Sequence, residues 1–172
     1  MTQPWKPQYF AKTTQSLAKQ VLPPKVYKGR GTKGLELMNQ DLLMTLDDLR
    51  KNLEVPLIVN DESWGRTQSG LRDEDHYGSV QSYLNSKSQH KYGNALDFVS
   101  PCLSSQEIRK HIIENKVLYP SISFLEVGKL KEERDMSWFH IDCRMRMSSQ
   151  QIVYWSPLYG FVDEERVLLE NL

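Results

Sequence analysis

Two histidines and one aspartate of this 172-residue sequence combine residue type and position in a way that could hold a catalytic zinc ion. His90 and Asp97 lie in the segment Ser88 to Phe98, and His140 lies in the segment Trp138 to Cys143. Two neutral imidazole nitrogens and one carboxylate oxygen leave a fourth coordination position open, as in catalytic rather than structural zinc sites. The spacing alone also fits histidines buried in an ordinary core. It therefore predicts a zinc centre without excluding that alternative.

Both segments have the alternating pattern of β-strands. Along residues 94–99 and 138–143, every second side chain points to the same face, so Asp97 and His140 each fall on one defined face. If the two strands are neighbours, their backbones lie roughly 4.8 Å apart. This separation lets an imidazole and a carboxylate converge on one ion. A carboxylate that faces the middle of a sheet is costly unless it is paired or bound to metal.

The third ligand precedes a glycine. Gly93 allows the chain to turn sharply after His90, which brings this imidazole back toward the strand that follows. The other two histidines are weaker candidates. His76 follows three acidic residues in a polar loop, and His111 lies in a helix beside two basic residues, so we expect both to be exposed.

The remaining pattern predicts an α+β domain. Leucines recur at helical spacing between Asn39 and Leu53, with Asp47 and its charged neighbours on the other side. The capping box Ser104-x-x-Glu107 opens a second helix. Further strands are expected over 57–59 and 122–127, and a last helix near Ser148 or Ser149. Because helices and strands are segregated, we expect a small central antiparallel sheet with helices packed on it.

The N-terminal part differs from the rest in composition. Residues 1–34 are rich in proline and glycine, and only Ala11 to Val21 could form a short helix, which the double proline ends. We therefore expect an irregular N-terminal extension over 1–34 and one catalytic domain over 35–172.

Charge and hydropathy exclude two classes of protein. Lys plus Arg and Asp plus Glu both number 22, so the formal net charge is zero. Nucleic-acid binders usually have a basic excess, and we expect no such partner. No apolar run approaches the roughly 20 residues that span a membrane, so we expect no membrane insertion. Residues 1–10 lack the pattern of a signal peptide, which predicts synthesis in a cytoplasm.

The combination S-x-H-x-x-G-x-A-x-D, followed by W-x-H-I-D, resembles the zinc D-Ala-D-Ala carboxypeptidase family. That family includes phage L-alanyl-D-glutamate endolysins and vancomycin-resistance dipeptidases, and the hedgehog signalling domain shares its fold. Upstream, Ser69-Gly70-Leu71-Arg72 resembles the S-G-Y-R motif of the family. The match covers roughly Leu37 to Arg144. The resemblance implies a hedgehog-like fold, zinc on His90, Asp97 and His140, and hydrolysis of peptidoglycan stem peptides.

The resemblance also implies roles for residues around the metal. Arg72 would hold a substrate carboxylate or a developing oxyanion. Ser88 would contact substrate or orient the site, although a serine that stabilises the turn fits as well. The cut could be that of a D,D-carboxypeptidase or of an endopeptidase. Without a signal peptide, a phage lysis or virion enzyme is favoured, which reaches the cell wall with the help of other phage proteins.

The general base is where the sequence departs from the family. Many relatives carry a glutamate three residues before the last histidine, and here that position is Ser137. Other relatives place the glutamate at the end of the preceding strand, which makes Glu126 the candidate. Asp135 and Asp142 remain alternatives, and Asp142 could instead orient a metal ligand. Ser137 also keeps open a virion or interaction module that binds zinc without hydrolysis.

Overall fold

Helices and strands are both present in the computed structural model, which describes residues 5–131, 134–135, 137–145, 149–170 and 172. One sheet has the strand order β1-β5-β2-β6-β7, and β3 pairs with β4 separately. The strands are β1 Ala95–Phe98, β2 Phe124–Glu126, β3 Lys129–Lys131, β4 Arg134–Asp135, β5 Phe139–Asp142, β6 Val153–Ser156 and β7 Gly160–Val162. The helices are α1 Thr14–Val21, α2 Pro24–Arg30, α3 Gln40–Leu53, α4 Glu74–Tyr77, α5 Val80–Asn85, α6 Ser105–Glu114 and α7 Glu164–Leu169, with 3-10 turns η1 Gly31–Leu37, η2 Glu62–Trp64, η3 Gln89–Tyr92 and η4 Lys116–Leu118. The α+β class predicted from the sequence is therefore confirmed, whereas the hedgehog-like fold stays a prediction.

The sheet is mixed, which corrects the expected antiparallel sheet. β5 pairs antiparallel with β1 and β2, and β6 pairs antiparallel with β7, but β2 and β6 run parallel. The C-terminal strands β6 and β7 form a hairpin, and β6 lies parallel beside β2; the sequence pattern predicts a helix near Ser148 or Ser149 instead. Ser148 lies outside the described residues, and Ser149 is in a bend. Gly160, with φ +74°, begins the second strand of the hairpin in a conformation that favours glycine.

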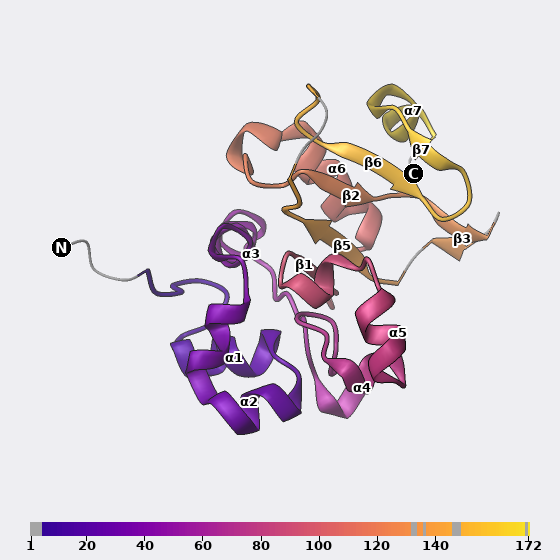
Figure 1. Ribbon diagram of the computed structural model, residues 1–172. Helices are drawn as coiled ribbons and strands as arrows, with labels where there is room; N and C mark the ends of the chain where they lie inside the picture. The colour runs from indigo at the N-terminus through magenta and orange to yellow at the C-terminus, as the bar shows by residue number, and fades with distance from the viewer. Residues whose placement is uncertain (1–4, 132–133, 136, 146–148, 171) are drawn as a thin grey trace.

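The helices surround the sheet unevenly. Figure 1 shows α6 behind β2 and β5, with α1 and α2 at the end of the molecule away from β6 and β7. A single buried cluster contains apolar side chains from α1, α3, α6 and the sheet. Among the described residues, no helix is long and apolar enough to cross a membrane.

Several predicted elements are present with small differences in their bounds. Helix α3 follows Asn39, whose side-chain oxygen accepts hydrogen bonds from the backbone N–H groups at the start of the helix. The capping box Ser104-x-x-Glu107 opens α6, as predicted. The strand expected over 57–59 reduces to an isolated antiparallel bridge between Ile58 and Val99. The bridge contains two backbone hydrogen bonds of 2.8 and 2.9 Å.

The strands that carry the candidate ligands are direct neighbours. β1 and β5 pair antiparallel, and Asp97 lies opposite His140 in the register. The alternate residues Leu96 and Phe98 of β1 are fully buried, as are Phe139 and Ile141 of β5. The alternation therefore sends apolar side chains to the core from one face of the strand pair, and the two polar side chains to the other.

Within the described residues 5–34, the chain forms α1, α2 and the start of η1, where the sequence pattern predicts an irregular segment with one short helix. Helix α1 ends before the double proline, as predicted, but Pro24 is then the first residue of α2. Proline suits this position because its missing N–H has no helical partner there and its φ is already helical. Leu17, Val21 and Leu22 are at most 1% exposed and belong to the common core.

Asp47 anchors the start of the described chain. The sequence pattern places this residue on the solvent side of α3, yet it is only 5% exposed. Its carboxylate accepts hydrogen bonds from the backbone N–H groups of Gln8, Tyr9 and Phe10, at 2.7 to 3.2 Å. A carboxylate that receives three main-chain donors is well compensated for its burial.

We expect the substitution Asp47→Ala to lower stability strongly, because three main-chain donors lose their acceptor together. Hydrogen bonds to charged groups contribute about 1.5–3 kcal/mol each, and water can reach part of this segment, so about 3 kcal/mol in total is expected. A loss of this size lowers the melting temperature by roughly 6–12 °C. Calorimetry with Asp48→Ala, the exposed neighbour, as the control checks this. Equal melting temperatures for the two variants would contradict the anchoring role.

Candidate metal centre

The side chains of His90, Asp97 and His140 converge at one point. His90 lies in η3, Asp97 in β1 and His140 in β5, and one potential ligand atom of each lies within 4.8 Å of the others. His90 Nε2 lies 3.3 Å from His140 Nδ1 and 3.2 Å from Asp97 Oδ1. His140 Nδ1 lies 2.7 Å from Asp97 Oδ1. The three residues identified in the sequence therefore form a group that could hold a metal ion.

Each imidazole has a partner on the ring nitrogen that points away from this group. His90 Nδ1 lies 2.8 Å from the carbonyl oxygen of Gly70, which can only accept a hydrogen bond. His140 Nε2 lies 3.4 Å from Asp142 Oδ2. Partners of this kind fix the tautomer of a ligating histidine and its ring orientation. They leave His90 Nε2 and His140 Nδ1 as the nitrogens that face Asp97.

Burial and mutual contacts shift the pKa values of these groups. Burial opposes the charged form of His140, but hydrogen bonds to Asp142 and Asp97 raise its pKa to about 9. Burial also opposes the charge of Asp97, yet the hydrogen bond from His140 holds its pKa below the usual value. For His90, burial is the largest effect and lowers the pKa. Without metal, His140 is therefore protonated and His90 neutral near pH 7.

We expect metal uptake near neutral pH to displace a proton from His140 Nδ1. A pKa of about 9 lies above pH 7.5, and only the deprotonated nitrogen can bind an ion. Apparent zinc affinity should therefore rise with pH from about 6.5 to 9. Calorimetric titrations in buffers of different ionisation enthalpy should show a release of about one proton from this group at pH 7.5.

The variant Asp142→Asn separates this proton from any released by bound water. It removes one of the two carboxylates that raise the pKa of His140, so proton release at pH 7.5 should be smaller. Equal proton release by variant and wild type would count against His140 as the source.

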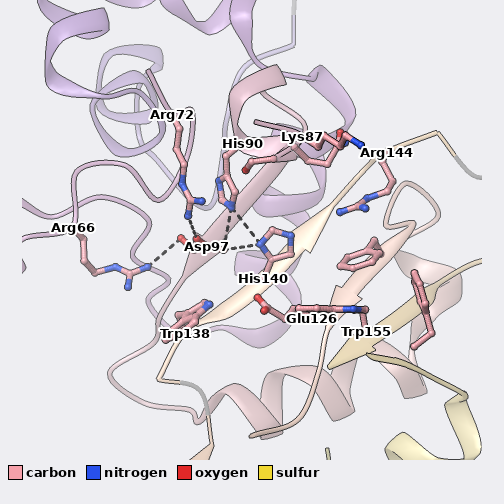
Figure 2. Close-up of a pocket in the computed structure, with 14 residues that line it drawn as sticks. Arg66, Arg72, Lys87, His90, Asp97, Glu126, Trp138, His140, Arg144 and Trp155 are labelled. Atoms are coloured by element: carbon pink, nitrogen blue, oxygen red, sulfur yellow. Dashed lines mark hydrogen bonds and ion pairs between the residues drawn. The ribbon is translucent and has the colours of Figure 1, made fainter. Parts of the chain in front are cut away.

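The group opens into a cavity of about 800 Å³. Figure 2 shows the three side chains at its centre, with Glu126 and Trp138 below and Lys87 and Arg144 above. Both faces of the strand pair are thus used, one for the core and one for the cavity.

Glu126 lies where the sequence places the candidate base. It ends β2 and lines the cavity, and its carboxylate points toward His140 in Figure 2. Burial is the largest effect on its pKa, which is raised; the positive charge of His140 and a hydrogen bond with Trp138 act in the opposite direction. A carboxylate with a raised pKa suits proton transfer near neutral pH.

Arg72 reaches the site but contacts a candidate ligand. Its Nη2 donates a hydrogen bond to Asp97 Oδ2 at 2.7 Å, and its Nε donates to the carbonyl of Gln68 at 2.9 Å. Arg66 approaches the same strand, because its Nη2 donates to the backbone oxygen of Asp97 at 3.3 Å. Both guanidinium groups therefore help to orient Asp97.

Asp142 and Ser88 are placed differently from each other. The Asp142 side chain is completely buried and is bound by Arg144, whose Nε lies 2.9 Å from both carboxylate oxygens. It contacts His140 from behind rather than lining the cavity. Ser88 is half-buried, lines the cavity and precedes η3 without a side-chain capping bond.

The other residues considered in the sequence lie outside the site. His76 is exposed, as expected, and does not line the cavity. His111 is not exposed as predicted; it is half-buried, and its Nε2 lies 2.8 Å from the hydroxyl of Tyr119. Ser137 lines a different cavity. The side chain of Asp135 lies outside the described part of the chain.

Sequence reasoning missed the cationic and aromatic walls of the cavity. Arg66 and Lys87 stand in loops with no distinctive spacing, and Trp155 and Phe161 belong to the unpredicted hairpin. Only Arg144 could have been found from the local sequence. It lies two residues after Asp142, close enough for its guanidinium to bind that carboxylate.

No protein-family model, no curated protein and no solved structure matches this chain.

Proposed function

We propose that this protein is a zinc-dependent peptidase that hydrolyses peptide bonds in bacterial peptidoglycan stem peptides. The observation that carries the proposal is the convergence of His90 Nε2, Asp97 Oδ1 and His140 Nδ1 beside a cavity that Glu126 also lines. The resemblance of the ligand motifs to the D-Ala-D-Ala carboxypeptidase family supplies the substrate class.

The spacing of the ligand atoms fits zinc. Tetrahedral bonds of about 2.0–2.1 Å place neighbouring ligand atoms about 3.3 Å apart. Two of the three separations are 3.2 and 3.3 Å, and the third is shorter, at 2.7 Å, where His140 Nδ1 hydrogen-bonds to Asp97. Imidazole nitrogen and carboxylate oxygen are both among the common ligands of zinc.

A zinc ion bound by three protein ligands supplies a Lewis acid that polarises a carbonyl and lowers the pKa of a bound water to about 7. Glu126 would accept a proton from the attacking water and deliver it to the leaving amine. Arg72 and Arg66 would hold Asp97 in place through their hydrogen bonds. This assignment makes Arg72 an orienting residue, in place of the carboxylate contact that the resemblance implies.

Digestion of purified peptidoglycan, followed by mass spectrometry of the products, tests the proposal. We expect zinc-loaded protein to release defined peptide fragments or single D-amino acids, and the masses identify the bond cut. A chelator should stop the reaction and added zinc should restore it. Stoichiometric zinc binding without any product would favour the non-catalytic module instead.

A further inference from the structure

Beyond the metal ligands, the cavity is rich in positive charge. Four lining side chains are cationic, and the only carboxylates among the described lining residues are Asp97 and Glu126. The four cations are Arg66, Arg72, Lys87 and Arg144. A concave site with an excess of one charge attracts ligands of the opposite sign. The bound zinc of the proposed peptidase would increase this excess.

Two of the four cations are already engaged with the protein. Arg66 donates from Nε to the carbonyl of Val59 at 3.2 Å and from Nη2 to the backbone oxygen of Asp97. Arg72 donates from Nη2 to the Asp97 carboxylate and from Nε to the carbonyl of Gln68. Each of them, like Arg144, keeps Nη1 without a hydrogen bond to a described residue, but the side chain of Arg72 is only 21% exposed, against 39% for Arg144. Arg72 is therefore less accessible to a ligand anion than Arg144.

The other two cations keep donors for a ligand. Lys87 is exposed and makes no hydrogen bond or ion pair with any described residue. Arg144 uses Nε and Nη2 for Asp142, while Nη1 has no hydrogen bond within the described part of the chain. Its guanidinium also lies over the ring of Phe124, 3.8 Å from the centroid. Held by an ion pair and a ring, this group is ordered before a ligand arrives.

These two cations lie on one side of the metal site. Figure 2 shows Lys87 and Arg144 together on the side of His140 away from Arg66. The side chains of Trp155 and Phe161, which are opposite each other on β6 and β7, line the same cavity. The cavity therefore offers both hydrogen-bond donors for an anion and apolar rings, which suits a carboxylate on a short aliphatic group.

We propose that Lys87 and Arg144 form a subsite that binds a free carboxylate of the substrate peptide. The inference rests on the proposed peptidase function, and it names these residues, rather than Arg72, as determinants of substrate selection. Two carboxylates of a stem peptide fit this chemistry: the C-terminal carboxylate and the free carboxylate of its D-glutamate residue.

Binding to protein that does not turn over its substrate tests the subsite. Zinc-loaded Glu126→Gln protein would be titrated calorimetrically with an N-acetylated stem pentapeptide, with its C-terminal amide, and with the form amidated at D-glutamate. We expect one of the two amides to bind about tenfold more weakly than the free acid, the loss of one charge-assisted hydrogen bond. The amide that weakens binding identifies which carboxylate the subsite takes.

The variant Lys87→Met in the same background connects the preference to the subsite. It should weaken binding of the free acid about tenfold. The affinity for the amide that binds the parent weakly should stay unchanged. Lys110→Met, an exposed lysine of α6 outside the cavity, is the matched control and should bind all three peptides like the parent. Equal binding of all three peptides by the parent, an equal loss for all three in Lys87→Met, or no binding at all would overturn the subsite.

These outcomes are separate from those of the peptidase proposal. If wild type hydrolyses nothing but Lys87→Met still loses the preference for the acid, the subsite stands and the peptidase proposal fails. If wild type hydrolyses stem peptides while the acid and both amides bind alike, the peptidase stands and the subsite fails.

Discussion

Asp97→Ala protein should fold but bind zinc at least about a hundredfold more weakly than wild type. Four-ligand zinc sites contribute about 10–16 kcal/mol, so each ligand accounts for roughly 2.5–4 kcal/mol, or about two to three orders of magnitude. Asp97 is also the residue that both imidazoles face, at 2.7 and 3.2 Å. Its removal leaves the Arg72 guanidinium without its carboxylate, which places a positive charge beside the ion.

Competition with a chromophoric chelator measures this loss, and circular dichroism confirms the fold. His76→Ala is the matched control, because His76 is an exposed histidine of α4 that lies outside the ligand group. Its zinc affinity should equal that of wild type. Equal losses in the two variants would show that the ligand set is wrong.

Glu126→Gln should keep its zinc and lose at least two orders of magnitude in turnover. Glutamine has nearly the same shape but cannot accept a proton at neutral pH, and a positioned base contributes roughly 10²- to 10⁴-fold to a rate. Glu126 is not among the three ligand residues, so metal content should be unchanged. Elemental analysis together with the initial rate of stem-peptide hydrolysis checks both halves of this expectation.

Two further carboxylates serve as controls for the base. Asp142→Asn should lower zinc affinity about 10- to 100-fold, the usual effect of losing a partner behind a ligating histidine. Asp135→Asn should act like wild type. A loss of turnover confined to the Asp135 variant would move the base to the segment between β3 and β5, and full activity of Glu126→Gln would falsify its assignment.

The candidate ligands were predictable because their signals are local. Alternation with a period of two fixes which face of a strand a residue occupies, whatever the rest of the fold. Leu96 and Phe98 therefore identified the core face of β1, and Asp97 followed on the other. The start of α6 at the capping box Ser104-x-x-Glu107 was equally predictable, because the hydrogen bonds of the box lie within four residues.

The burial of Asp47, the contact of Arg72 and the strand β6 could not be predicted, because each depends on residues distant in the sequence. Asp47 looks like a surface residue of α3 until the main chain of residues 8–10 is known to approach it. Arg72 lies in a segment that resembles a family motif, but its contact with Asp97 spans 25 positions. Residues 153–156 form a strand because β6 pairs in parallel with β2. The local sequence of residues 153–156 gives no information about that pairing.

Gly70 joins the N-terminal helices to the metal centre. A Cβ at this position would lie 2.1 Å from the carbonyl oxygen of Val21, the last residue of α1, and Leu71 donates its N–H to the same oxygen at 2.8 Å. On its other side, the Gly70 carbonyl accepts from His90. Anything that binds only the folded arrangement stabilises all the contacts on which that arrangement depends. Docking of α1 and occupancy of the ion site are therefore thermodynamically linked, so each makes local opening of the other less frequent.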